Sequence, residues 1–204
     1  MGVIPPPEFM EKVTKVINEI GSVLFLNILF LLTSVLTLGV AMGTAWSALL
    51  ATFMDLKSDD TGYYVRNYFK HFKLEFKETV GINLILIVVI VGAFFLLTLI
   101  NNRIEDGTLK LILFIASFAL LLEIALVASF FYPVSVKFEG DMMKHLYLSF
   151  LFAHRYIYYS ILFVALFVGS LYLCVYVSFA FLFICYGGAG YLEAKILKHL
   201  WRNY

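Results

Sequence analysis

Residues 35–46 read VLTLGVAMGTAW and interrupt an uncharged, mostly apolar tract that covers residues 20–54. The tract has roughly 35 residues, too many for one membrane crossing and about right for two short ones. Glycine gives the backbone freedom to turn, and threonine hydroxyls can hydrogen-bond the backbone groups that a turn leaves free. We therefore predict a helix over 20–37 and a shorter returning helix over 40–54, joined by an extracytoplasmic turn. The candidate turn residues are Thr37, Gly39, Gly43 and Thr44.

The composition of the chain is that of a membrane protein. Of its 204 residues, 62% are hydrophobic and only 14% are charged. A soluble domain is about 45–50% apolar and about 25% charged, so this chain has too little polar surface to face water alone. The net charge of +1 argues against nucleic acid as a partner.

Two further tracts have the length and composition of helical hairpins. Residues 79–133 break once, at the polar sequence NNRIEDGT, and Pro133 disfavours helix before it, so the second helix should end near Phe131. Residues 156–192 contain a glycine–serine pair at 169–170, where we place the turn of the third hairpin. The predicted membrane segments are 20–37, 40–54, 79–100, 109–131, 156–169 and 171–192. The predicted segments outside the membrane are an interfacial helix over 1–19, cytoplasmic loops over 55–78 and 134–155, and a cytoplasmic tail over 193–204.

The distribution of basic residues favours six crossings. With the N-terminus inside, every Lys and Arg except Arg103 and Lys110 lies in a cytoplasmic segment, as the positive-inside rule predicts. If each long tract is one tilted helix, with glycines that only allow close packing, the charges divide about evenly between the two faces. Five crossings give an intermediate bias and stay open. The predicted fold is an all-α polytopic transmembrane bundle of about six membrane segments in one domain, with cytoplasmic termini and amphipathic interfacial helices.

The first cytoplasmic loop, residues 55–78, carries two parallel stripes at helical spacing. Mostly aromatic residues recur at i, i+4, i+7 and i+11, and basic residues follow one position later. Both an anchor at the lipid interface and a docking helix for a partner fit this pattern. The candidate docking residues are Arg66, Phe69, Lys70, Phe72, Lys73, Phe76 and Lys77, with Lys144 in the second loop.

The second cytoplasmic loop contains a short copy of part of the first. Met143–Phe150 aligns without gaps on Phe69–Phe76, and the lysine, histidine, leucine and final phenylalanine match. Each of the two segments precedes a predicted span. We interpret the match as two similar helix–loop–helix units, a common arrangement in membrane proteins.

Three side chains with a carboxylate or amide group lie within predicted spans. Glu123 stands in the middle of its span, where a carboxylate costs several kcal/mol unless it is neutral, paired or facing a cavity. No basic residue occurs at matching depth in another span, and all four histidines fall in cytoplasmic segments. We therefore favour a structural role for Glu123, within the bundle or toward a partner subunit, over a substrate or proton site. Asn27 and Asn83 are expected to hydrogen-bond between helices.

Nothing in the sequence points to an enzyme. It has no nucleophile motif, no phosphate-binding loop and no pair of carboxylates inside a span. The histidines lack neighbours suited to metal binding. Cys174 and Cys185 lie in apolar sequence without a CxxC spacing and fit small buried side chains. We expect no catalytic residues, no cofactor and no metal.

Several stretches of the chain resemble the YesL-like family of bacterial integral membrane proteins, a domain of unknown function. They are FLNILFLLTSVLTLGVAMGTAWSAL, which contains Asn27, then YYVRNYFKHFKLEFKETV and FYPVSVKFEG. The resemblance implies the cytoplasmic membrane of a Gram-positive bacterium. It also implies an association with carbohydrate uptake, because proteins similar to this one are typically encoded beside sugar ABC importers and glycan-degrading enzymes. It supplies no catalytic residues.

These observations lead to one expected function and two alternatives. We expect a non-enzymatic accessory or regulatory subunit of an oligosaccharide ABC importer, with the importer permeases and membrane lipids as partners. A small independent transporter is the first alternative, and it would need Glu123 or Asn27 to line a cavity. A membrane assembly or organising protein without a transport role is the second.

Overall fold

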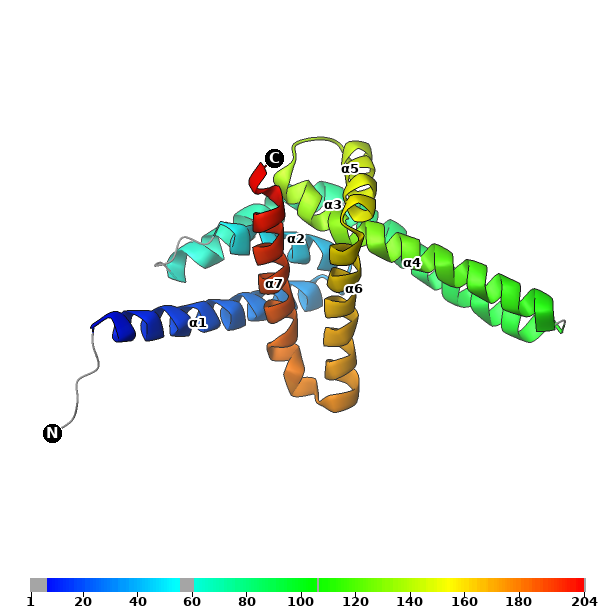
Figure 1. The fold of residues 1–204 in the computed structure, drawn as a ribbon, viewed down its shortest axis with the longest axis horizontal. Coiled ribbons are helices and arrows are strands. Elements are labelled where there is room, and N and C mark those ends of the chain that lie inside the picture. The colour runs from blue at the N-terminus through cyan, green and yellow to red at the C-terminus, as the bar shows by residue number, and fades with distance from the viewer. Residues whose placement is uncertain (1–6, 56–60, 106, 204) are drawn as a thin grey trace.

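The computed structural model describes residues 7–55, 61–105 and 107–203, and within these ranges the chain forms seven α-helices and no strands (Figure 1). The elements are α1 (Pro7–Leu36), α2 (Met42–Met54), α3 (Thr61–Arg103), α4 (Gly107–Lys137), α5 (Met142–Arg155), α6 (Ile157–Tyr172), the π-helical turn η1 (Leu173–Val177), the 3-10 turn η2 (Phe179–Phe183), α7 (Cys185–Leu200) and the 3-10 turn η3 (Trp201–Asn203). In these ranges four helices, α1, α3, α4 and α6 with its η1 extension, are long and apolar enough to cross a bilayer. The predicted all-α fold is confirmed, and the chain is a multi-pass membrane protein.

The first helix is longer than predicted. α1 begins at Pro7, a residue suited to the first turn of a helix, and continues without a break to Leu36. The predicted interfacial helix over 1–19 and the predicted first span over 20–37 are therefore one helix. Residues 1–6 of that prediction lie outside the described residues.

The chain reverses between α1 and α2, as predicted. Leu38 and Gly39 have a left-handed backbone, with φ of 50° and 77°, and the Gly39 N–H donates to the Ser34 carbonyl at 2.8 Å. Glycine adopts this conformation without steric cost, so the turn closes here. The alternative of a single tilted helix is wrong. The placement of Gly43 and Thr44 in the turn is also wrong, because both lie inside α2.

The short helix α2 lies at the centre of the molecule, and its residues from Gly43 to Phe53 are all buried (Figure 1). A Cβ on Gly43 would overlap the ring of Tyr132, so the glycine allows α4 to approach α2 closely. The hydroxyls of Thr44 and Thr79 share a hydrogen bond of 2.7 Å that ties α2 to α3. The small and hydroxyl residues of the opening stretch therefore serve packing as well as the turn.

The hairpin of α3 and α4 projects away from the rest of the molecule (Figure 1). α3 is one continuous helix, so the predicted loop 55–78 and the predicted span 79–100 are not separate elements, although residues 56–60 lie outside the described part of the chain. We call the apolar outer part of this hairpin, residues 84–122, the arm. Its large apolar side chains are mostly exposed, and only 6% of the most apolar window of each helix is buried.

The helix α4 does not end near Phe131 as predicted. It continues to Lys137, with a buried Pro133 inside it. Proline removes one backbone hydrogen bond, but membrane helices tolerate it where hydroxyls and packed neighbours compensate. Here the inner part of α4, which contains Pro133, packs against α2, α3 and α5. The predicted boundary is wrong because these neighbouring helices support α4, and no sequence pattern near the proline shows them.

The second cytoplasmic loop contains α5, which packs back along α4 rather than lying free. Asp141 caps its N-terminus by accepting a hydrogen bond from the Lys144 N–H at 3.1 Å. Phe152, near the end of α5, stacks on Phe130 of α4 with ring centroids 6.3 Å apart. Most of the predicted loop 134–155 is therefore part of the packed structure.

The last hairpin reverses later than predicted. Ser170 lies inside α6, and its hydroxyl donates to a carbonyl one turn earlier at 2.7 Å. The helix then loosens into η1 and breaks at Ser178, an extended residue whose hydroxyl accepts from the Ala180 N–H at 3.3 Å. The predicted turn at 169–170 is wrong, and the returning helix begins only at Cys185. This finding corrects the predicted spans 156–169 and 171–192, because the first helix continues to Tyr172 and the second begins at Cys185.

Candidate functional site

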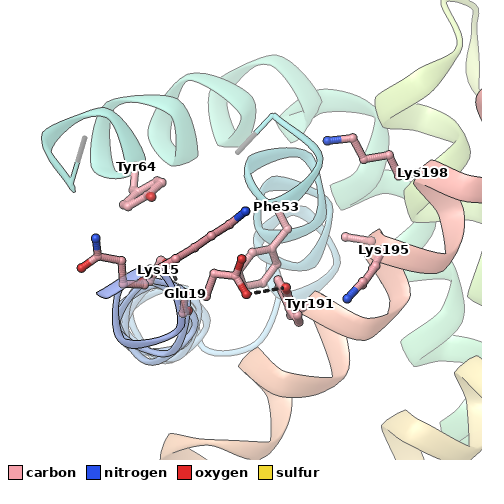
Figure 2. Close-up of a pocket in the computed structure, with 10 residues that line it drawn as sticks. Lys15, Glu19, Phe53, Tyr64, Tyr191, Lys195 and Lys198 are labelled. Atoms are coloured by element: carbon pink, nitrogen blue, oxygen red, sulfur yellow. Dashed lines mark hydrogen bonds between the residues drawn. The ribbon is translucent and has the colours of Figure 1, made fainter. Parts of the chain in front are cut away.

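A cleft of about 200 Å³ lies where four helices meet (Figure 2). Its walls come from the first half of α1, the end of α2, the start of α3 and the second half of α7. The cleft thus brings together the N-terminal parts of α1 and α3 and the C-terminal parts of α2 and α7, which the sequence analysis predicts to be cytoplasmic. The charged and aromatic lining residues are Lys15, Glu19, Phe53, Tyr64, Tyr191, Lys195 and Lys198.

The charge of the cleft is predominantly positive, because three lysines face one glutamate. Glu19 accepts a hydrogen bond from the Tyr191 hydroxyl at 3.2 Å (Figure 2). The ammonium of Lys195 lies 5.9 Å from the centre of the Tyr191 ring. Lys198 donates to the Met54 carbonyl at 3.3 Å, which places a cation at the C-terminal end of α2, where the helix dipole favours one.

A second cleft of about 410 Å³ lies on the other side of Lys198. It is also basic, with Lys137 and Arg202 in its walls. Its carboxylate, Asp55, contacts the imidazole of His71 at 3.0 Å. This end of the molecule therefore carries two neighbouring basic depressions that share one lysine.

Three histidines lie against carboxylates, a pattern that the sequence did not show. Each pair joins two different helices or a helix and its neighbouring turn, with nitrogen–oxygen distances of 3.0–3.2 Å. In two pairs the second ring nitrogen faces a backbone carbonyl at 2.9 Å. The pairs are His71–Asp55, His145–Glu78 and His154–Glu123.

The pairing of Glu123 corrects the sequence argument. We expected no histidine or basic residue near it, but α5 folds back along α4 and brings His154 Nε2 within 3.2 Å of Glu123 Oε1. The structural role that we favoured keeps its support, since the carboxylate has a partner within the bundle. Both side chains stay partly accessible, His154 at 45% and Glu123 at 42%. The pair lies at the edge of the arm.

The two aligned loop segments place their histidines in related positions. His71 contacts Asp55, the residue that follows α2, and His145 faces the carbonyl of Phe138, the residue that follows α4. Each histidine therefore reaches back to the end of the preceding helix. This shared geometry supports the interpretation of two similar helix–loop–helix units.

Asn27 and Asn83 make hydrogen bonds of the expected kind. Asn27 donates to the Leu182 carbonyl at 2.9 Å and so joins α1 to the broken segment before α7. Asn83 donates to the carbonyls of Gly39 and Val40 at 3.2 and 2.6 Å, and it accepts from the Tyr132 hydroxyl at 3.2 Å. One amide thereby connects α3, the first turn and α4.

The predicted docking residues of the first loop lie on α3, and the structure divides them. All the basic members are exposed, as are Phe69 and Phe76, whereas Phe72 packs against the buried ring of Tyr68. Lys144 is held differently, because its ammonium donates to the Glu139 carbonyl at 2.6 Å. The exposed members that stay available to lipid or a partner are Arg66, Phe69, Lys70, Lys73, Phe76 and Lys77.

Glu193, the first residue of the predicted cytoplasmic tail, is buried on α7, outside the four helices that are long enough to cross. Its Oε1 atom has no hydrogen-bond partner in the described structure. Burial disfavours the charged carboxylate and raises the pKa of Glu193 well above its usual range. This side chain therefore holds its proton at a pH where ordinary glutamates have lost theirs.

The described residues contain no group of three or more His, Cys, Asp or Glu side chains that could hold a metal ion. What the arrangement offers is binding, through basic clefts, and intramembrane contact, through the arm.

Sequence reasoning missed the cleft because its lysines come from opposite ends of the chain. It missed the histidine pairs because no local pattern shows that α5 packs on α4.

Comparison with known proteins gives one match. Residues 23–98 match the family described as "Protein of unknown function, DUF624". The matched stretch runs from α1 through α2 to the outer part of α3, and it includes Asn27 and Asn83. The YesL-like family is a DUF624 family, so the match agrees with the sequence resemblance at that level. No curated protein and no solved structure matches the chain.

Proposed function

We propose that this protein is a non-enzymatic accessory or regulatory subunit that packs against the permeases of an oligosaccharide ABC importer in the cytoplasmic membrane of a Gram-positive bacterium. The observation that carries the proposal is the arm. Its two apolar helices pack on each other and on little else within the chain (Figure 1). The resemblance to YesL-like proteins, and not the geometry, supplies the importer and the sugar.

The arm supports a docking role because the rest of the molecule does not need it for its core. The buried aromatic and aliphatic clusters lie around α2, α7 and the inner part of α4. Helix association in lipid depends on close packing and on hydrogen bonds between helices, and the arm extends such a surface beyond the core. A permease helix that packs along it would bury side chains that the chain itself leaves open.

The pair of Glu123 and His154 at the edge of the arm gives a second reason to expect a partner there, because both side chains are ionisable. Ionisable side chains within a membrane are costly where they face hydrocarbon. Both members are more than 40% accessible in the chain alone. A partner helix that covers them with a polar side chain or backbone would remove that cost and fix the orientation of the two proteins.

Site-specific photocrosslinking in native membranes tests this proposal. A photoreactive phenylalanine analogue replaces Phe94 or Phe118, which lie on the arm and are 74% and 69% exposed. Phe179 on η2 is the matched control, since it is also an apolar phenylalanine and is 70% exposed. We expect importer permeases to crosslink at the two arm positions and not at the control position.

Two outcomes would count against the proposal. Crosslinks from the arm that reach only lipid or other copies of this chain would show that no permease covers it. Equal permease crosslinking at Phe179 would show non-specific proximity. A tagged protein that never enriches importer permeases from native membranes would argue for the membrane-organising alternative.

One observation favours a second candidate, the small independent transporter. The His154 partner places a second titratable group beside Glu123, which a proton-coupled path requires. Uptake of substrate by the reconstituted protein alone, with loss of uptake in Glu123→Gln, would establish this function. Absence of uptake in the reconstituted wild type would remove it.

A further inference from the structure

We propose that the cleft between α1, α2, α3 and α7 binds a phosphate group, which belongs either to an anionic phospholipid of the cytoplasmic leaflet or to a phosphate in solution. The inference does not depend on the proposed function. It concerns a different surface from the arm, and it rests on the charge, depth, size and lining of the cleft.

The charge of the cleft is the first argument. Lys15 and Lys195 line it from α1 and α7, and among the described residues neither ammonium has a carboxylate within 4.0 Å. The carboxylate of the cleft, Glu19, already accepts a hydrogen bond from Tyr191. Figure 2 shows Lys15 reaching across the opening toward Phe53. Two ammonium groups are thus left to donate to an external anion.

The depth of the cleft is the second argument. Glu19 directly precedes the uncharged tract over residues 20–54, and Phe53 lies at the other end of that tract. The cleft therefore sits where hydrocarbon-compatible sequence ends and charged sequence begins, which is the level of the lipid headgroups. Phosphate is the anion that is most concentrated at this level, and basic residues there attract it.

The size and walls of the cleft are the third argument. Pockets for drug-sized ligands have roughly 300–1,000 Å³, so a cleft of about 200 Å³ suits a group the size of phosphate rather than an oligosaccharide. Its aromatic wall is ordered, with the rings of Phe53 and Tyr191 edge to face at 5.7 Å and Tyr64 buried. An apolar wall beside a cationic rim accommodates the glycerol and first methylenes of a lipid.

The test uses the full-length protein in a neutral detergent. The midpoint of thermal unfolding is followed during titration with short-chain phosphatidylglycerol, with phosphatidylcholine, or with inorganic phosphate. We expect saturable stabilisation by phosphatidylglycerol and none by phosphatidylcholine, whose choline cancels the phosphate charge. Saturable stabilisation by inorganic phosphate that phosphatidylglycerol does not exceed would assign the same site to a soluble phosphate.

Variants connect the effect to the cleft. The double variant Lys15→Gln/Lys195→Gln should bind on the order of 25-fold more weakly, as expected for the loss of two lysines near an anionic surface. Lys12→Gln/Arg103→Gln removes the same charge from exposed positions outside the cleft and should bind like the wild type. All four side chains are exposed, so both variants should keep the wild-type elution volume in size-exclusion chromatography.

The proposal is overturned if none of the three additives stabilises the wild type. It is equally overturned if the cleft variant titrates like the wild type or if the control variant weakens binding as much. These outcomes are independent of the photocrosslinking result, because neither Phe94 nor Phe118 contributes to the cleft.

Discussion

The core helix α2 and the arm are both strongly apolar in sequence, yet they have opposite surroundings. Nearly all of α2 is buried by other helices of the chain, while the most apolar windows of α3 and α4 are only 6% buried. Hydropathy identifies both as membrane segments and cannot separate them. The difference lies in small and polar side chains, which α2 carries along its length and the arm has only sparsely. In lipid, such residues decide which apolar helices pack together.

The largest expected effect comes from truncating a core aromatic ring. Phe30 is 1% exposed and contacts the rings of Trp46 and Tyr186 at 5.6 and 5.7 Å. Phe30→Ala should lower the free energy of unfolding by about 3 kcal/mol, because it leaves a cavity and removes ring contacts. Phe94→Ala, on the arm, should change it by less than about 0.5 kcal/mol. Denaturant titration in detergent micelles measures both; equal losses would mean that the arm also belongs to the core.

The second largest expected effect on stability comes from a substitution at a glycine in the core, with a glycine on the arm as its control. Gly43→Leu forces a side chain into the ring of Tyr132 and should cost about 2 kcal/mol through overpacking between α2 and α4. Gly92 on the arm has no atom within 4 Å of a Cβ position, so Gly92→Leu should be tolerated. Thermal unfolding and the elution profile of the two purified variants test the contrast. A stable Gly43→Leu protein would show that these helices are not in close contact.

Loss of an interhelical amide should have a smaller effect. Asn83→Leu removes three hydrogen bonds that join α3 to the first turn and to α4. Such bonds contribute about 0.6 kcal/mol each in membrane proteins, so the expected loss is about 1.8 kcal/mol. Thr98→Val on the arm is the control, because its hydroxyl bonds only the Phe94 carbonyl of its own helix. Equal stability of the two variants in denaturant titration would contradict the role assigned to Asn83.

The difference between local and long-range hydrogen bonds explains which turns the sequence could predict. The first turn was predictable because Gly39 and Thr37 break a uniform tract locally. The last break was not, because the carbonyl that it frees at Leu182 is satisfied by Asn27, 155 residues away. A local search placed that break at a glycine–serine pair, which the structure keeps within a helix. Local chemistry predicts a turn when its hydrogen bonds are local, and it fails when another helix supplies them.

The candidate site follows the same rule. The basic and aromatic residues of α3 were visible as a pattern, because one helix presents them at regular spacing. The cleft of Lys15 and Lys195 was not, because it exists only when α1 and α7 meet. The pair of His154 and Glu123 was likewise hidden, since it requires α5 to fold back along α4. Sequence periodicity describes one helix at a time, and both sites lie between helices.

The smallest expected effect lies where the core meets the arm, at Glu123 and His154. A double-mutant cycle with Glu123→Gln and His154→Gln should give a coupling energy of about 0.5–1 kcal/mol, modest because both side chains are partly accessible. A second cycle with Glu105→Gln and His199→Gln is the control, because these residues lie at the tip of the hairpin and near the C-terminus, at distant places in the fold. The control coupling should be zero within error. A coupling near zero for Glu123 and His154 as well would show that packing alone holds α5 on α4. A coupling that rises when the permeases are present would instead place the partner directly on this pair.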